Sequence, residues 1–448
     1  MIASLLLLSA LAAPADQLIR EIAEHAELMP NLEILSDDIG PRLTGSNSLH
    51  SAQAWAMKTL RRYGAANVHT ESYAFGLPWH RGVERARLIN GSGLTLDVAQ
   101  WGWTKGTKGA VRGEVVLVDT PTLAQFEALA PRLAGKVLLV KARPRPTEDE
   151  RHDEKAYRAR LTRAWRSVPF AAALIPSGLE GGLLEMAGGP GHLYDARTAF
   201  ISKDHAAMLE RLLARGTKPV VELELGGDFG PKPVSAENLV AEWPGAQSPD
   251  EVVILGAHLD SWDLGSGATD NGAGVVAFME VLRAFQATGL RPRRTLRLVL
   301  FSGEEQALLG SKAYLLSHAA ELDKIQAVLV LDAGAGRILG VADGQVDAWA
   351  EALQRALEPA GALGPIDVQY ARANGSDQET FRGAGLPAFG FQQDPGDYWS
   401  HTHHTRLDDL GHVVAGDLLQ ATQVLAVLAW GLLEGPKLPR VAMDEPRR

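Results

Sequence analysis

The 448-residue chain contains no cysteine. Disulfide bonds, thiolate zinc sites, a cysteine nucleophile and an acylated lipoprotein cysteine are therefore excluded, and any metal ion must be held by histidine and carboxylate side chains. Positive charge is also scarce, because 44 Lys and Arg residues stand against 54 Asp and Glu residues, for a formal net charge of −10. A chain of this sign repels nucleic-acid phosphates, so we expect no nucleic-acid partner.

Long apolar runs are missing as well. No segment approaches the about 18 uninterrupted apolar residues of a membrane-spanning helix, so we predict no membrane span. The first residues, MIASLLLLSALAA, contain a short apolar core followed by an A-x-A pattern at Ala10–Ala12. These features are typical of a secretory signal peptide, although no Lys or Arg precedes the core. We predict a signal peptide over residues 1–13 and a secreted or periplasmic protein; the alternative is the frayed end of an apolar helix.

Several familiar catalytic motifs are absent too. The chain has no H-E-x-x-H, no phosphate-binding P-loop and no G-x-S-x-G, which argues against a single-helix zinc protease, a nucleotide-binding site of that kind and a serine hydrolase of that type. Apolar residues make up 46% and charged residues 22%, a composition typical of a folded globular protein. The chemistry therefore has to be sought in residues that lie far apart in the sequence.

The pattern of the chain predicts one α/β domain interrupted by an insert. Helical spacing in residues 17–29 and 47–63 is followed by short β-rich runs from about residue 85, and from residue 238 strand and helix patterns alternate. The later strand runs, such as EVVILGA and TLRLVLFS, are apolar throughout, which favours a parallel sheet buried on both faces. We predict a three-layer α/β/α domain built from 14–84 and 228–436, a β-rich insert over 85–227 and a tail over 437–448.

Polar residues follow the predicted strands where a parallel sheet binds ligands, at its carboxyl edge. We expect all of these side chains to converge on that edge, which makes them one candidate site: His258, Asp260, Asp270, Glu304, Glu305, Asp332, His401, His403, His404 and Asp408. Each also has a simpler interpretation, such as a structural histidine, a helix or turn cap, or a surface metal patch at the three C-terminal histidines. The joint pattern favours the site.

Two or more histidines with several carboxylates form a ligand set for zinc, with cobalt or manganese as alternatives. A loop aspartate such as Asp270 can bridge two ions with its two oxygens. The adjacent Glu304 and Glu305 repel each other unless a cation lies nearby, so one of them could bind metal while the other takes a proton from water. Asp260 could accept the ring N–H of His258 and fix its tautomer.

Four segments, HLDSWDLGSGATDNGAG, LFSGEEQALLGS, LDAG and HHTRLDD, together resemble the co-catalytic zinc exopeptidases of the aminopeptidase and glutamate carboxypeptidase type. The insert looks like the protease-associated domain of that family. The resemblance implies two Zn²⁺ per chain, with Co²⁺ or Mn²⁺ as substitutes. Its ligand pattern places one zinc on His258 and Asp332, the other on Glu305 and His404, with Asp270 bridging, Glu304 as general base and Asp260 behind His258.

His404 is chosen over its neighbours because it stands four residues before Asp408, as in the family's H-T-x-x-D-T pattern, where this chain has Asp409 in place of the last Thr. The resemblance implies hydrolysis of short peptides by a dipeptidase or carboxypeptidase, and the aminopeptidase branch shares the same metal motifs. Rival functions on this fold are a catalytically silent binding or receptor module and a single-zinc acyltransferase. The oligomeric state stays open, a homodimer included. Loop residues near the rim are candidates for substrate binding: Asn374, Ser376, Asp377 and Tyr398.

Overall fold

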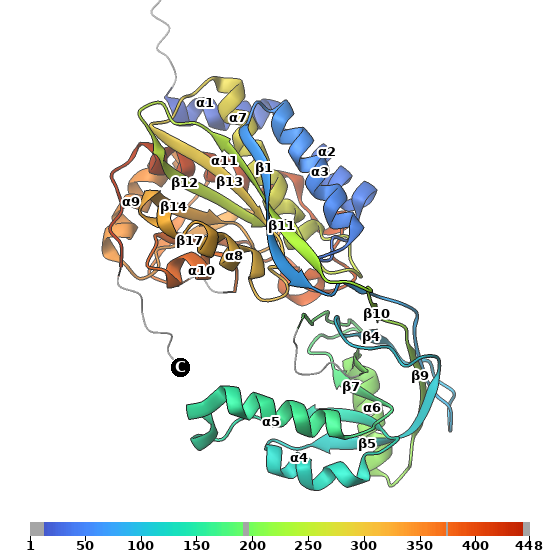
Figure 1. The fold of residues 1–448 in the computed structure, drawn as a ribbon. Helices are drawn as coiled ribbons and strands as arrows, with labels where there is room; N and C mark the ends of the chain where they lie inside the picture. Colours follow the sequence, from blue (N-terminus) through green and yellow to red (C-terminus); the bar gives the residue numbers. More distant parts are fainter. Residues whose placement is uncertain (1–12, 191–196, 373–374, 442–448) are drawn as a thin grey trace, which may run out of the picture.

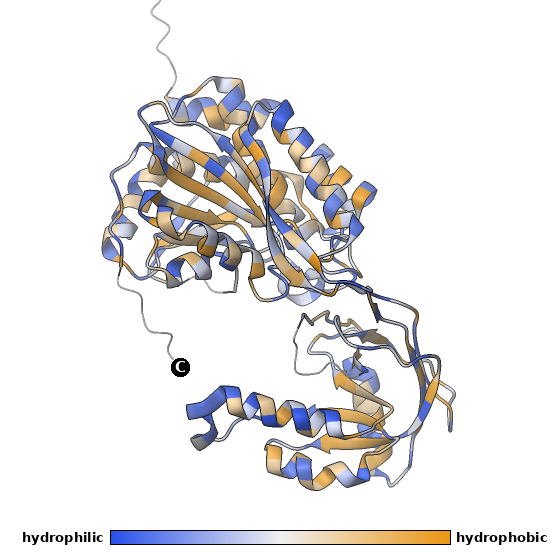
Figure 2. Ribbon diagram, viewed as in Figure 1, coloured by the Kyte–Doolittle hydropathy of each residue, from blue (hydrophilic) through white to orange (hydrophobic). Residues whose placement is uncertain are grey.

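The computed structural model describes residues 13–190, 197–372 and 375–441. Most of the predicted signal peptide, part of the predicted tail and Asn374 lie outside these ranges. Figure 1 shows two lobes, a larger one that contains both ends of the described chain and a smaller one built from its middle. In Figure 2 the hydrophobic residues concentrate in the strands of both lobes.

The larger lobe contains an eight-stranded sheet in the order β1-β11-β13-β12-β14-β17-β15-β16. Its strands are β1 (Ala66–Gly76), β11 (Val234–Trp243), β12 (Ser248–His258), β13 (Arg294–Phe301), β14 (Ile325–Val330), β15 (Ile338–Ala342), β16 (Asp367–Gln369) and β17 (Ala388–Gln393). The four central strands, β13, β12, β14 and β17, run parallel to one another. Their carboxyl ends therefore share one edge of the sheet.

The central strands are apolar throughout because both faces of the sheet are covered. In β12, Val253 and Leu255 belong to the core on one face, and Val252 and Ile254 belong to the core on the other. Strand side chains alternate between faces, so a strand covered on both sides needs apolar residues at every position. The predicted three-layer α/β/α class is confirmed.

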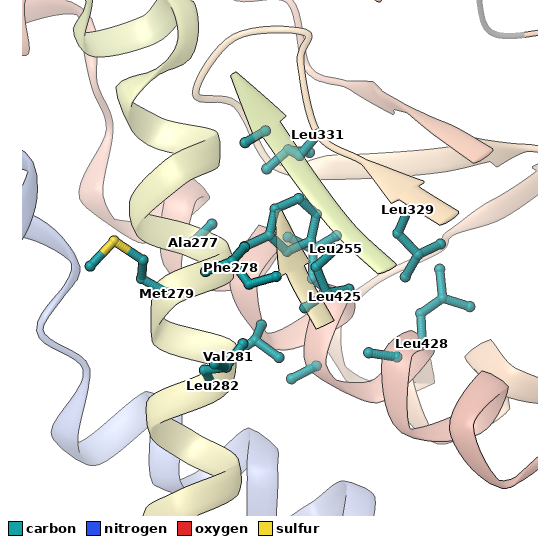
Figure 3. Close-up of a cluster of buried hydrophobic side chains, with 14 of the residues drawn as sticks. Leu255, Ala277, Phe278, Met279, Val281, Leu282, Leu329, Leu331, Leu425 and Leu428 are labelled. Atoms are coloured by element: carbon teal, nitrogen blue, oxygen red, sulfur yellow. The ribbon is translucent and has the colours of Figure 1, made fainter. Parts of the chain in front are cut away.

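Helices form the outer layers. One face is covered by α1 (Pro14–His25), α2 (Leu28–Glu33), α3 (Asn47–Arg62), α7 (Ala273–Thr288), α9 (Asp347–Leu357) and α11 (Ala415–Glu434), and the other by α8 (Leu309–Ser317) and α10 (Gln378–Gly383). Figure 3 shows Phe278 of α7 and Leu425 of α11 packed around Leu255 of β12. This packing holds the central strands rigidly, and with them the residues that follow each strand.

The edges of the sheet differ from the predicted parallel arrangement. β1 pairs antiparallel with β11, β11 pairs antiparallel with β13, and β15 pairs antiparallel with β17. The chain leaves the larger lobe after β1 and re-enters at β11, so these two neighbours are joined through the whole smaller lobe. An antiparallel pair needs no crossover helix packed on the same sheet, so a separate lobe can be inserted between β1 and β11.

The smaller lobe is built on a seven-stranded sheet in the order β3-β9-β5-β6-β7-β8-β4. Its strands are β3 (Glu84–Leu88), β4 (Val98–Gln100), β5 (Val111–Asp119), β6 (Val137–Ala142), β7 (Ala172–Pro176), β8 (Thr198–Ile201) and β9 (Val220–Leu225). Helices α4 (Leu123–Leu129) and α5 (Glu154–Ser167) pack on one face, and α6 (Lys203–Ala214) packs on the other. The short strands β2 (Trp79–His80) and β10 (Asp228–Phe229) pair with each other where the chain passes between the lobes.

A buried aromatic cluster joins the two lobes. It contains Trp79, Trp103 and Met186 from the chain between β1 and β11 and Trp262 from the loop after β12. Arg81 adds two hydrogen bonds of 2.9 Å to Asp263 in the same loop. The smaller lobe is thus packed directly against the loop that follows β12.

Among the described residues, α11 is the helix whose length and apolar composition would allow it to cross a membrane. In this fold 72% of the apolar stretch of α11 is buried, and the helix packs against α7, α9 and α1. Its apolar surface is therefore used in the core of the larger lobe.

Candidate active site

The carboxyl edge of the sheet brings the predicted residues together. His258 ends β12, Asp332 follows β14, and Glu304 and Glu305 follow β13. Asp270 lies in a π-helical turn, Ala268–Gly272, directly before α7. The long loop after β17 carries His404 to the same place, although His258 and His404 are far apart in the sequence.

His258 and its two carboxylate neighbours form one half of the cluster. Its Nε2 atom lies 3.2 Å from Asp270 Oδ1 and 3.3 Å from Asp332 Oδ1. The His258 side chain is 1% exposed. Burial alone would lower the pKa of His258, but the adjacent Asp332 and Asp270 carboxylates outweigh burial and raise that pKa well above its usual value. The pair of carboxylates thus draws a positive charge to this point.

His404 and Glu305 form the other half. His404 Nε2 lies 3.0 Å from Glu305 Oε2 and 3.6 Å from Asp270 Oδ2. His403 stacks on His404 with ring centroids 3.8 Å apart and also comes within reach of Asp270. His401 is exposed and contacts Ser400 instead. Asp270 is therefore the residue shared by both halves, with one oxygen turned to each histidine.

The residues present fit metal ions. Ligand atoms of His258, Asp270 and Glu305 lie within 4.8 Å of one another, as do those of Asp270, His403 and His404, and those of His258, Glu304 and Asp332. Asp270 Oδ2 and both Glu305 oxygens are buried yet accept no hydrogen bond from any described residue. Buried carboxylate oxygens are costly without a partner, and divalent cations supply one.

Electrostatics single out Glu304 and Glu305. Burial, together with neighbouring carboxylates such as Asp332 beside Glu304 and Asp270 beside Glu305, raises the pKa of each well above its usual value. Asp270 behaves in the opposite way: burial would raise its pKa, but contacts with His258 and His404 hold it below the usual value. A site with this much uncompensated negative charge attracts cations strongly.

Asp260 acts on the site differently from the prediction. His258 Nδ1 lies 2.9 Å from the main-chain oxygen of Asp260, whereas the Asp260 carboxylate is 3.7 Å away. The carboxylate instead accepts hydrogen bonds from Thr44 Oγ1 at 2.9 Å and from the Glu304 N–H at 3.3 Å. Only Leu259 separates the two residues, and the chain turns the Asp260 carbonyl, rather than the Asp260 side chain, toward the His258 ring. Asp260 thereby links His258 to the backbone of Glu304.

Asp408 holds the turn that presents Asp270. Its Oδ1 atom accepts hydrogen bonds from the Thr269 N–H at 2.6 Å and from Thr269 Oγ1 at 2.8 Å. Burial and the nearby charge of Asp270 raise the pKa of Asp408 to about 7. The spacing of His404 and Asp408 in the sequence thus has a structural meaning, because one residue contacts Glu305 while the other fixes the Asp270 turn.

Arg42 is a site residue that the sequence analysis missed. Its side chain is fully buried and donates four hydrogen bonds to main-chain oxygens, those of Gly40, Leu259, Ser266 and Gly267, at 2.7–3.2 Å. Burial lowers the pKa of Arg42 to about 10, with the Asp408 and Asp260 charges opposing that effect. The guanidinium therefore stays charged at neutral pH and ties the loop after β12 to the N-terminal segment. Its turn-rich surroundings, IGPRLTGS, offered no sign of this role.

We predict that Arg42→Met lowers the free energy of unfolding by about 3–5 kcal/mol, because it leaves several buried carbonyl oxygens without a donor. Urea unfolding followed by circular dichroism measures the effect. Arg215→Met, at an exposed position after α6, is the control and should stay within about 0.5 kcal/mol of the wild type. Equal stability of the two variants would show that Arg42 does not anchor the loop.

A cleft of about 1230 Å³ opens above this cluster. Tyr398 and the exposed ring of Trp399 line it. Of the other residues predicted to bind substrate, Ser376 and Asp377 are buried behind the cleft wall, and burial raises the pKa of Asp377 to about 7. Asn374 lies outside the described residues. The geometry therefore favours Tyr398 as a substrate contact over Ser376 and Asp377.

The smaller lobe supplies one wall of the cleft. Ala187, Gly188, Gly189 and Pro190 line it. The preceding Met186 N–H donates a 2.8 Å hydrogen bond to the main-chain oxygen of His404. The inserted lobe thus contacts the backbone of a candidate ligand, and the cleft is formed by both lobes.

Comparison with known proteins agrees with this geometry. Mouse carboxypeptidase Q is 32% identical over 412 residues, covering 89% of this chain and 84% of that protein. A solved peptidase M28 precursor from Shewanella amazonensis SB2B superposes with a TM-score of 0.81 at 28% identity, covering 96% of this chain and 98% of that one. BSAP, a zinc aminopeptidase from Bacillus subtilis, shares the fold with a TM-score of 0.66 at 19% identity, covering 93% and 94%.

The sequence profile described as Peptidase family M28 matches residues 238–429. This segment contains every candidate metal ligand, the candidate general base Glu304 and its neighbour Asp260. The expected resemblance to the zinc exopeptidases of the aminopeptidase and glutamate carboxypeptidase type is confirmed. The chain belongs to peptidase family M28.

Proposed function

We propose that the chain is a two-zinc exopeptidase that hydrolyses short peptides, of the dipeptidase or carboxypeptidase kind. The observation that carries this proposal is the position of Asp270, which has one oxygen 3.2 Å from His258 and the other 3.6 Å from His404. In the proposed ligand set, His258 and Asp332 would hold one ion, Glu305 and His404 would hold the other, and Asp270 would be shared by both. Co²⁺ or Mn²⁺ could replace zinc in such a set.

Bound in this cluster, paired zinc ions would lower the pKa of a water molecule and polarise the scissile carbonyl. The chain's own residues do the proton transfer. Glu304 lies beside His258 and Asp332 and lines the cleft, so its carboxylate can accept a proton from the attacking water and return it to the leaving amine. The Asp260 carboxylate accepts a hydrogen bond from the Glu304 backbone N–H. Because the Asp260 carbonyl also contacts His258, Asp260 holds Glu304 in position relative to His258.

Glu304 suits this task because of its surroundings. Burial and the neighbouring carboxylates raise its pKa well above the usual value. A base whose proton affinity is higher than that of a free carboxylate holds the proton long enough to pass it on. Retention of this residue with all five proposed ligands speaks against a catalytically silent binding module.

A panel of substrates tests the function. The zinc-loaded protein is expected to hydrolyse unsubstituted dipeptides, to lose that activity in a chelator and to regain it when zinc is added. N-blocked peptides and aminoacyl anilides complete the panel, because faster cleavage of the anilides would assign the protein to the aminopeptidase alternative. A full complement of one zinc per chain without peptide hydrolysis would favour the single-zinc acyltransferase.

We also propose that the protein is exported. The support is the apolar core and A-x-A pattern within residues 1–13. Mass spectrometry of the protein purified from its natural source is expected to show a new N-terminus directly after Ala12 or Ala13. A chain that keeps Met1 and is found only inside the cell would contradict export.

A further inference from the structure

Glu304 and Glu305 lie in a short turn that is closed at its base by a buried asparagine. Asn238 of β11 is 1% exposed. Its Oδ1 atom accepts a 3.1 Å hydrogen bond from the Ser302 N–H, directly after β13, and its Nδ2 atom donates a 2.9 Å hydrogen bond to the main-chain oxygen of Gly310 in α8. One side chain therefore joins the two ends of the segment that carries both glutamates.

The two ends of this segment approach each other so closely that only glycine fits at the second end. A Cβ atom on Gly310 would lie 2.5 Å from Asn238 Oδ1 and 2.3 Å from the main-chain oxygen of Ser302. Tyr73 of β1 adds a second restraint, because its hydroxyl donates a 2.7 Å hydrogen bond to the same Ser302 oxygen. The segment is thus fixed from β1 and β11, two strands that carry no candidate metal ligand themselves.

The turn needs this restraint because its backbone is strained. Ala307 and Leu308 have φ angles of 81° and 60°, in the left-handed region that residues other than glycine rarely adopt. The N–H groups of both donate 2.9 Å hydrogen bonds to the main-chain oxygen of Glu304, so the turn winds tightly around this residue. A strained conformation persists only where the surrounding structure holds it. Without the Asn238 contacts, we expect the turn to relax and Glu304 to move.

We propose that Asn238 positions Glu304 for proton transfer. This assignment rests on the proposed peptidase function and concerns the residue that acts as its base. Asn238 is buried and, within the described part of the chain, lies outside the cleft lining, so it acts through the turn rather than on the substrate. A displacement of about 1 Å in a catalytic site can lower the rate about 10²-fold, so a residue outside the cleft can affect turnover strongly.

The test compares Asn238→Ala with Gln53→Ala, both in excess zinc so that weaker binding at Glu305 does not limit metal occupancy. Gln53 is the matched control because it is also buried, and its Nε2 atom donates a 2.7 Å hydrogen bond to the main-chain oxygen of Glu237 on the same strand. Each variant loses a buried amide that contacts β11, so the midpoint of urea unfolding should fall in both. For Ala-Leu hydrolysis, kcat of Asn238→Ala is expected to fall about 10²-fold with little change in KM, whereas Gln53→Ala keeps the wild-type kcat.

Two further readouts separate positioning from a loss of stability. Hydrogen–deuterium exchange of the metal-free protein should be faster over residues 302–310 in Asn238→Ala, but not in Gln53→Ala. In the Glu304→Gln background, Asn238→Ala should lower kcat by less than about twofold, because the base that it positions is already missing.

If Asn238→Ala does not fold, Asn238→Asp takes its place with the same expectations, because aspartate keeps the acceptor for the Ser302 N–H and lacks the donor to Gly310. Wild-type kcat in the Asn238 variant, an equal fall in the Gln53 variant, or a fall of about 10²-fold in the Glu304→Gln background would overturn the assignment. Failure of the wild type to cleave any peptide would instead count against the proposed function.

Discussion

Replacing Glu304 by glutamine is expected to lower kcat for dipeptide hydrolysis by about 10²–10⁴-fold while two zinc ions per chain stay bound, because proton transfer by a positioned base contributes about that much. Glutamine keeps the size of the side chain but cannot accept the proton of the attacking water. In the proposed ligand set Glu304 holds no metal, so zinc content should not change. Steady-state kinetics and elemental analysis of the dialysed protein measure the two quantities.

The adjacent residue provides the matched control. Glu305→Gln changes the same chemical group one position later, but Glu305 faces His404 and Asp270 and is a proposed ligand. We expect this variant to lose zinc as well as activity. If Glu304→Gln also lost zinc, or kept wild-type turnover, Glu304 would not be the general base.

Replacing Asp270 by alanine is expected to have the widest effect of any single substitution, because both halves of the cluster share this residue. Zinc content should fall from two ions per chain to fewer than one, and kcat/KM should fall about 10³-fold or more, as expected when a metal-dependent mechanism loses its ions. Equilibrium dialysis against buffered zinc, followed by elemental analysis, measures the loss directly.

His401→Ala is the control for this experiment. His401 lies in the same histidine-rich loop as His404, but it is exposed and contacts Ser400, so its removal should leave two ions bound. Far-UV circular dichroism checks that Asp270→Ala is folded, which we expect because Asp408 holds the turn through Thr269 rather than through Asp270. A folded Asp270→Ala protein that still binds two zinc ions would show that Asp270 does not bridge them.

The sequence predicted the parts of the fold that depend on local pattern. Strands β12, β13 and β14 are continuous apolar runs because both faces of the sheet are covered, and the residues after them meet because parallel strands end at one edge. The antiparallel pairing of β1 with β11 depends instead on a return of the chain after the whole smaller lobe, which no local pattern encodes. The strand β16 was not expected because its three residues are too few to show a strand pattern.

In the candidate site, too, local pattern predicted some residues, whereas others are recognised only in the folded chain. His258, Asp270, Glu305, Asp332 and His404 stand out as charged or imidazole residues beside apolar runs, and the structure places them together. Arg42 and Thr44 lie more than 200 residues from the atoms they bind, Leu259 O and the Asp260 carboxylate. The Met186 contact with His404 is made through backbone atoms, so no side-chain type marks it. Support of this kind becomes visible only when the chain is folded.

In the proposed site, five side chains that are distant in the sequence hold two metal ions, with Asp270 shared between them. Anomalous diffraction at the zinc absorption edge, from crystals of the zinc-loaded protein, tests it most directly. Two peaks separated by about 3.5–4 Å are expected, one between His258 and Asp332 and the other between Glu305 and His404, with Asp270 between them. A single peak, or peaks away from these residues, would contradict it.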